Sequence, residues 1–208
     1  MDTSIVIRAV IFDFGNVICR FDPNLFVRAI APYSTKSVAE LGKMLMSSSD
    51  LFVDYETGRI SSSTFLELMS IRCSLSCSQD QFIPAFSCIF THNLPMFELI
   101  RALKPRYRLG LLSNTSEWHF QHGIRPTEVF PLFDTVTLSF EVGVMKPGED
   151  IYRDALQKLD LPPQECVYID DIREYADAAT ALGLHGIHYA DHSALMQRLA
   201  ELGVLERG

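Results

Sequence analysis

Polar side chains that could do chemistry together follow four short apolar runs of this chain. Each of them alone is ordinary turn or helix-cap chemistry. If the four runs are parallel strands, however, their carboxyl ends meet at one edge of a sheet, which is where ligands of such sheets bind. In chain order, these side chains are Asp13, Ser113, Asn114, Lys146, Asp170 and Asp171.

Three carboxylates at close range repel one another, so Asp13, Asp170 and Asp171 indicate a cation between them. Hard oxygen ligands without histidine favour Mg²⁺ over zinc. Mg²⁺ and the Lys146 ammonium would neutralise charge on a transferring phosphoryl group. A carboxylate could attack phosphorus and form an aspartyl phosphate, while Ser113 and backbone N–H groups hold phosphate oxygens. The pattern therefore favours phosphoryl transfer.

Strands and helices alternate along most of the chain. This alternation predicts an α/β fold with a parallel sheet and helices on both of its faces. The expected strands are Arg8–Phe14, Leu109–Leu112, Thr135–Leu138, Val167–Ile169 and Gly186–Tyr189. The expected helices are Met96–Leu103, Ile151–Leu159, Tyr175–Leu182 with Gly183 at its end, and a last helix capped by Ser193.

Residues 17–93 interrupt the alternation with helical patterns alone. That is too much helix for one crossover, so we expect a small all-helical cap inserted after the first strand. Residues 1–16 and 94–208 would then form a Rossmann-like α/β core. The expected cap helices are Leu25–Ile30, Ser37–Met46, Ser63–Ser70 and Asp80–Phe90, the last shortened or kinked by Pro84.

Composition limits the class of protein. A chain of 208 residues with 48% hydrophobic residues can bury one core carrying a small insert. Its net charge of −8 argues against a nucleic-acid partner, and no apolar run reaches the ~20 residues of a membrane span. The chain has 5 cysteines, and their scattered positions argue against a disulfide framework. The first residues do not resemble a signal peptide. We expect a cytoplasmic protein without a membrane partner, and the oligomeric state is left open.

Four segments carry a resemblance to a known family. They read IFDFGNV, LLSNTS, VGVMKPGEDIY and YIDDIREYADAATALG. Together they resemble the motifs of the haloacid dehalogenase superfamily of hydrolases, in the same order and spacing. The first is similar to the Asp-x-Gly-Asn-Val motif of a subgroup that includes bacterial phosphatases of the glucose-1-phosphate type. The segment YETGRISSSTFLELM resembles the helical cap of many members.

The resemblance implies an Mg²⁺-dependent phosphatase that acts on a small phosphorylated metabolite through an aspartyl phosphate. A sugar phosphate is the substrate class that the subgroup suggests. The implied roles are Asp13 as nucleophile and metal ligand, the Gly15 carbonyl as metal ligand, Ser113 with Asn114 as phosphate-binding groups, Lys146 as the orienting cation, Asp171 as direct metal ligand and Asp170 as its neighbour, direct or through water.

The chain departs from the family pattern at three positions. Gly15 stands where most family phosphatases have a second Asp, the general acid and base, whose contribution is typically about 10²–10⁴-fold. Asp22 or His119 are weak substitutes, since a surface Asp and a helix-face His are the simpler interpretations. Ile172 and Tyr175 replace the small polar residue and the Asn that commonly follow the acidic pair.

Other activities stay open at this point. A catalytically weak phosphate-binding protein would explain the missing acid. A metal-independent dehalogenase also lacks the second Asp, but it has no use for the pair Asp170–Asp171. A phosphonate hydrolase would need a lysine in the cap, which offers only Lys36 and Lys43.

The insert offers two further groups of residues. Arg20, Asp22 and Tyr55 are the expected substrate contacts from the cap. The gaps between a second group resemble the spacing of structural zinc ligands, although buried free cysteines are common in helical cores. That second group is Cys73, Cys77, Cys88 and His92.

Overall fold

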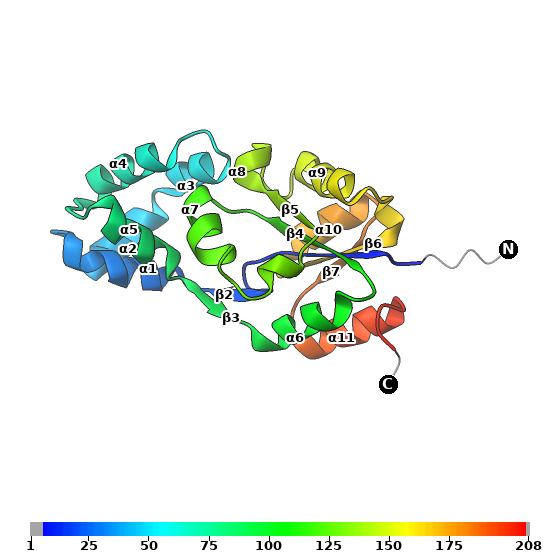
Figure 1. Ribbon diagram of the computed structural model, residues 1–208. Coiled ribbons are helices and arrows are strands. Elements are labelled where there is room, and N and C mark those ends of the chain that lie inside the picture. Colours follow the sequence, from blue (N-terminus) through cyan, green and yellow to red (C-terminus); the bar gives the residue numbers. More distant parts are fainter. Residues whose placement is uncertain (1–5, 207–208) are drawn as a thin grey trace.

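Five parallel strands form the central sheet of the computed structural model, which describes residues 6–206 (Figure 1). The strand order β5-β4-β1-β6-β7 places β1 in the middle, so the sheet is wound in both directions from it. The predicted parallel α/β sheet is confirmed, although residues 1–5 and 207–208 of the expected core lie outside the described range. The strands are β1 (Ala9–Phe12), β4 (Arg108–Ser113), β5 (Thr135–Leu138), β6 (Cys166–Asp170) and β7 (His185–His188).

Both faces of the sheet are covered by helices, as the unbroken apolar run of β1 requires. Val10 and Phe12 pack in the layer formed with α6 (Leu94–Leu103) and α11 (His192–Glu201). Ala9 and Ile11 point to the opposite layer, which α9 (Glu149–Leu159) and α10 (Arg173–Ala181) complete. Figure 1 shows α6 and α11 on one side of the strands and α9 and α10 on the other.

The four core helices predicted from apolar patterns lie near their expected positions, with small shifts at their ends. Asp191, not Ser193, caps the last helix, because its carboxylate accepts a hydrogen bond from the Ala194 N–H at 2.9 Å. The helices are α6 (Leu94–Leu103), α7 (Glu117–His119) with a π-helical turn (Phe120–Ile124), α8 (Ser139–Val142), α9 (Glu149–Leu159), α10 (Arg173–Ala181) and α11 (His192–Glu201); single 3-10 turns cover Phe130–Leu132 and Pro163–Glu165.

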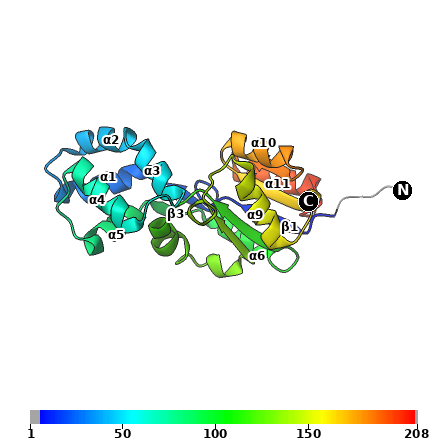
Figure 2. The same ribbon diagram turned by 90° about the horizontal axis from the view of Figure 1, so that it is seen from above.

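The residues between β1 and α6 form a separate group of helices, which we call the helical insert. It has its own aromatic core, in which Phe65, Phe82 and Phe86 are fully buried. Figure 2 shows the insert lying beyond one end of the sheet. Its elements are α1 (Pro23–Ile30), a 3-10 turn (Ala31–Tyr33), α2 (Val38–Met46), α3 (Ser49–Glu56), α4 (Ser62–Cys73) and α5 (Gln79–Ser87), which holds Pro84 inside it.

Two parts of the insert were not expected from the sequence. Helix α3 begins in a serine run that resembles a linker, and it is stabilised by burial of Leu51 and Tyr55 in the insert core. Strands β2 (Cys19–Phe21) and β3 (Phe90–His92) pair antiparallel and connect the insert to the sheet. Each is too short to show a period in the sequence.

None of the helices in the described range is long and apolar enough to cross a membrane. All five cysteines lie within this range, and each is a free thiol.

Gly186 in β7 allows α10 to approach the sheet closely. A β-carbon at Gly186 would lie 2.0 Å from the Ala176 carbonyl oxygen. We therefore expect Gly186→Ala to lower the free energy of unfolding by about 1–3 kcal/mol, through overpacking. Gly42→Ala in α2 is the matched control, because a β-carbon there meets no atom within 4 Å. It should leave stability unchanged or raise it by about 0.5–1 kcal/mol. Urea unfolding of both variants is the measurement, and equal midpoints would contradict the packing argument.

Candidate active site

A buried lysine joins two of the strand ends. The Lys146 Nζ lies 2.7 Å from Asp13 Oδ1 and 2.7 Å from Asp170 Oδ2. Asp13 directly follows β1, Asp170 ends β6, and Lys146 comes from the loop after α8. Their exposed fractions are only 6%, 4% and 0% in the order Asp13, Lys146, Asp170. The sequence pattern of polar residues at strand ends thus becomes one contiguous site.

Asp170 uses both carboxylate oxygens on protein donors. Its Oδ1 accepts from the Ile172 N–H at 2.8 Å. Its Oδ2 accepts from Lys146 and from the Tyr168 hydroxyl. Asp170 thus contacts the Lys146 ammonium, and Ile172 contributes its backbone N–H, which its apolar side chain does not affect.

Asn114 holds the backbone of Lys146. The Asn114 Oδ1 accepts from the Lys146 N–H at 2.8 Å, and its Nδ2 donates to the Lys146 carbonyl at 3.2 Å. Ser113 is buried beside it at the end of β4, with its hydroxyl 3.4 Å from the Asn114 carbonyl oxygen. The ammonium of Lys146 also lies 5.2 Å from the centre of the Tyr175 ring. Tyr175 therefore contributes an aromatic face where the family commonly has an Asn.

Burial and the neighbouring charges shift the pKa values of Asp13 and Lys146. Burial raises the pKa of Asp13 to about 7, although the Lys146 ammonium acts against this rise. Burial disfavours the charge of Lys146, but the carboxylates of Asp13 and Asp170 outweigh it and raise its pKa. Lys146 is therefore held as a cation between two carboxyl groups.

Three carboxylates could hold one metal ion. Each of Asp13, Asp170 and Asp171 offers an oxygen, and these oxygens lie within 4.8 Å of one another. Asp171 is half-buried and accepts a hydrogen bond from Asn16 Nδ2 at 3.0 Å, and burial raises its pKa. One lysine cannot balance three carboxylates, so a divalent cation fits the remaining negative charge. Oxygen ligands of this kind suit Mg²⁺.

The site opens into a cavity of about 220 Å³, which we call the strand-end cavity. Its walls combine residues from the loops that follow the strands, and Tyr175 of α10, with two from the helical insert and its connection. Those two are Glu56 at the end of α3 and Phe21 in β2. The remaining lining residues are Asp13, Gly15, Asn16, Asn114, Met145, Lys146, Asp171, Ile172 and Tyr175.

The profile of the haloacid dehalogenase-like hydrolases matches residues 7–183 of this chain. The chain belongs to this family. The family expectation and the expectation of a hydrolase are therefore confirmed. The match spans β1, β4, β5 and β6 of the sheet, the helical insert and all four groups of strand-end residues, and it ends before β7.

Two relatives that are similar to this hydrolase over most of its length are phosphatases. It is 26% identical to the sesquiterpene phosphatase of Aspergillus oryzae over 94% of this chain and 96% of that protein. It is 25% identical to the D-ribitol-5-phosphate phosphatase of Bacteroides thetaiotaomicron over 80% and 84% of the two chains. Among solved structures, a family enzyme of B. thetaiotaomicron in complex with magnesium and inorganic phosphate is similar in fold. Its TM-score is 0.77 at 20% identity, over 91% of this chain and 98% of that one.

The three substrate contacts expected from the insert of the hydrolase do not line the strand-end cavity. Arg20 is exposed on β2. Asp22 caps α1, with its Oδ1 accepting from the Asn24 N–H at 2.9 Å. Tyr55 is buried in the insert core, where its hydroxyl lies 2.7 Å from Ser62 Oγ and accepts from the Trp118 N–H. The next residue, Glu56, faces the cavity instead, and no motif in the sequence marked it.

The question of a zinc site in the insert, which the sequence left open, is answered against zinc for the described residues. Among the described residues, Asp13, Asp170 and Asp171 are the one group of three or more such side chains close enough for a metal ion. Cys73 is buried in the insert core, and the exposed Cys88 lies 3.1 Å from the Ala85 carbonyl oxygen. His92 packs on the ring of Phe97. Their spacing follows from packing within and beside the helices.

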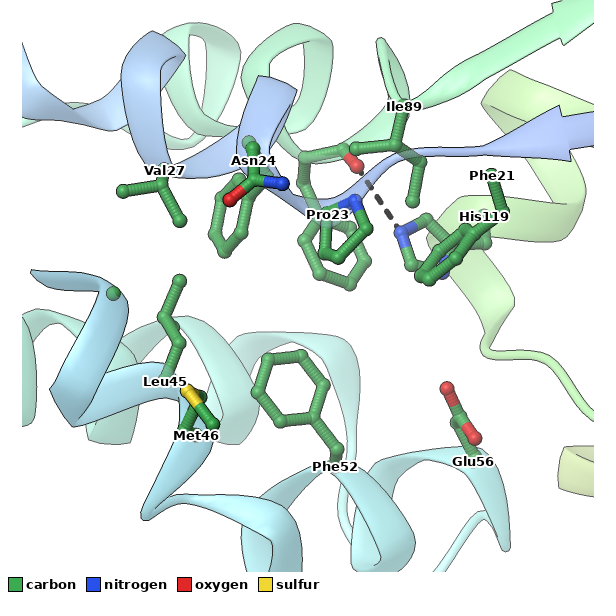
Figure 3. A pocket seen from close by; sticks show the side chains of 13 residues that line it. Phe21, Pro23, Asn24, Val27, Leu45, Met46, Phe52, Glu56, Ile89 and His119 are labelled. Carbon is green, nitrogen blue, oxygen red and sulfur yellow. Dashed lines mark hydrogen bonds between the residues drawn. The ribbon is translucent and has the colours of Figure 1, made fainter.

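His119 is not placed to donate a proton at the site of the hydrolase. Its ring stacks on Phe86 with centroids 3.9 Å apart, and its Nε2 donates to the Phe86 carbonyl at 3.1 Å (Figure 3). Burial lowers the pKa of His119 to about 4, so the ring is neutral at neutral pH.

This neutral histidine makes stability depend on pH. The unfolded chain takes up a proton near pH 6.5 that the folded protein accepts only near pH 4, so the free energy of unfolding falls as pH falls through this window. The contribution of His119 is about 3 kcal/mol at most. His119→Phe should show a smaller fall than the parent in urea unfolding at several pH values. His122→Phe, at an exposed neighbouring position, is the control, and an unchanged fall in His119→Phe would contradict the prediction.

Proposed function

We propose that this hydrolase is an Mg²⁺-dependent phosphatase that cleaves small phosphomonoesters through a phosphoryl group carried on Asp13. The contact of Asp13 with Lys146, beside Asp171, is the observation that carries the proposal. Two phosphatases among its relatives support the proposal. A protein of similar fold that binds magnesium and inorganic phosphate supports it as well.

Asp13 and Asp171 would hold the metal ion, with the Gly15 carbonyl and Asp170 as further ligands that the family resemblance implies. Mg²⁺ bound there would neutralise charge on the oxygens of the phosphoryl group. Asp170 already binds Lys146 and Tyr168 through one oxygen. We therefore propose that its main task is to hold the lysine.

The reaction has two displacements at phosphorus. In the first, an oxygen of Asp13 forms a bond to phosphorus, and the bond from phosphorus to the oxygen of the leaving alcohol breaks. Lys146 orients the Asp13 carboxylate and faces the charge of the phosphoryl group. In the second, water attacks phosphorus, phosphate leaves, and the Asp13 carboxylate is restored. Ser113 and Asn114 at the end of β4 are the proposed phosphate-binding groups.

Glu56 is the proposed replacement for the acid that Gly15 cannot provide. Its side chain lines the same cavity as Asp13, and burial raises its pKa to about 7. A carboxyl group with this pKa is partly protonated at neutral pH, which suits a general acid. It would give its proton to the leaving oxygen and take one from the attacking water.

Residues 17–93 are the proposed cap over this site. The insert places Glu56 and Phe21 at the cavity, and closure over the strand ends would exclude water from the reacting groups.

We also propose a cytoplasmic location, since free thiols are typical of reducing compartments.

The other activities are less well supported by the site. A metal-independent dehalogenase has no need for Asp171 beside Asp13. A phosphate-binding protein without turnover would bind phosphate but release none from esters.

Phosphate release tests the proposed function directly. The protein is assayed on acetyl phosphate, aryl phosphates, alkyl phosphates and sugar phosphates, with Mg²⁺ and with a chelator. We expect release that depends on Mg²⁺ and is abolished in Asp13→Asn, because the amide cannot form the phosphoryl bond. Asp54→Asn, at a surface ion pair with Arg59, is the control. Release that persists in Asp13→Asn would contradict the mechanism, and no release from any ester would favour the binding protein.

Replacing Glu56 tests its role as proton donor. Glu56→Gln should lower kcat by about 10²–10⁴-fold for an alkyl phosphate, whose alkoxide leaves poorly. The loss for acetyl phosphate should be small, because acetate leaves without a proton. Glu67→Gln on the exposed face of α4 is the matched control. An equal loss on both substrates, or none, would show that Glu56 does not protonate the leaving group.

A further inference from the structure

A second, larger pocket lies within the helical insert, and we call it the apolar pocket. Its volume is about 540 Å³, in the range of about 300–1,000 Å³ that is usual for small-molecule sites. Figure 3 shows Val27, Asn24 and Pro23 along one wall and Leu45, Met46 and Phe52 along the other. These walls belong to α1 on one side and to α2 and α3 on the other.

The apolar pocket adjoins the strand-end cavity. Phe21 and Glu56 line both of them. Figure 3 shows these two residues, with His119, at one end of the apolar pocket, and Met46 and Val27 toward the other. A molecule with its phosphate at Asp13 would therefore reach Glu56 first and extend between α1 and α2 beyond it.

The walls of the apolar pocket offer few hydrogen bonds to a ligand. Of its polar side chains, Asn24 donates to Asp22 Oδ1 at 2.9 Å, and His119 donates to the Phe86 carbonyl. Glu56 remains at the end shared with the strand-end cavity. Hydroxyl groups of a sugar in this pocket would lose their bonds to water and find few replacements.

Charge also narrows the choice of ligand. The described residues that line the apolar pocket include no lysine or arginine. A second phosphate or a carboxylate on the ligand would thus meet no cation there. The pocket fits an uncharged, apolar group instead. Met46 at its wall is 84% exposed, so its side chain is accessible to such a group.

We propose that the substrate is the monophosphate of an apolar alcohol, with an alkyl or terpenoid chain lying in the apolar pocket between α1 and α2. This proposal rests on the proposed phosphatase function and names its substrate class. It replaces the sugar-phosphate class that the subgroup resemblance suggests. Glu56 lies where the phosphorylated head and the apolar chain of such a substrate would join.

A series of substrates tests the proposal. Phosphate release is measured for butyl, hexyl, octyl and decyl phosphate, all below the concentrations at which they form micelles, and for ribitol phosphate and acetyl phosphate. We expect kcat/KM to rise about two- to fourfold per methylene until the pocket is filled. The rise from butyl to octyl should be at least about tenfold, and ribitol phosphate should be a poorer substrate than octyl phosphate.

Variants assign the chain-length dependence to the pocket. Gly42 lines it, and a β-carbon there meets no atom within 4 Å, so the side chain of Gly42→Leu begins in open space at the pocket wall. We expect Gly42→Leu to flatten the rise with chain length, and Met46→Glu to reduce it by placing a charge at the wall. Ile71→Glu is the matched control, since Ile71 is 70% exposed on α4 and does not line the pocket. It should keep the rise.

The outcomes separate this proposal from the proposed function. Mg²⁺-dependent release from acetyl phosphate, with kcat/KM independent of chain length or highest for ribitol phosphate, would overturn the apolar substrate and leave the phosphatase intact. A rise that Gly42→Leu and Met46→Glu do not change would overturn the pocket as its cause. If no ester is hydrolysed, calorimetric Kd values of the same alkyl phosphates decide. Tighter binding with each methylene supports the pocket, and equal Kd values overturn it.

Discussion

The structure of this hydrolase depends on one buried lysine held between two carboxylates. Asp13 and Asp170, at the ends of β1 and β6, would repel each other as two nearby negative charges. The Lys146 ammonium lies between them and joins the two strand ends. Asn114 holds the lysine backbone, and Tyr175 covers its ammonium. The parallel sheet is needed because only its carboxyl edge brings these segments to one place. Leaving one such charge without its partner would cost the fold heavily, so site and fold depend on each other.

The helical insert adds what the sheet cannot supply. The strand ends of the sheet present the nucleophile, the cation and the carboxylates, but Gly15 has no side chain that could act as a general acid. The insert brings Glu56 to the strand-end cavity, and its helices enclose an apolar pocket that begins at the same residue. The proposed chemistry and the proposed choice of substrate therefore meet at one side chain, at the end of α3.

Much of the core could be predicted from the sequence, because buried parallel strands are apolar throughout and end in polar residues. The insert was harder to predict for physical reasons. Helix α3 is stabilised by tertiary packing of Leu51 and Tyr55, which its serine-rich start conceals. Whether Tyr55 or Glu56 faces the cavity depends on the rotation of α3, and a sequence does not fix that rotation. The cysteine spacing resembled a zinc site because helices place small apolar residues at similar intervals.

The central claim is that Asp13 carries the phosphoryl group. Rapid acid quenching during turnover of acetyl phosphate, followed by peptide mass spectrometry, tests it most directly. The account predicts a transient phosphoryl adduct on the peptide that contains Asp13, formed only with Mg²⁺ present. Turnover at full rate with no adduct at any quench time, or an adduct on a different residue, would contradict it.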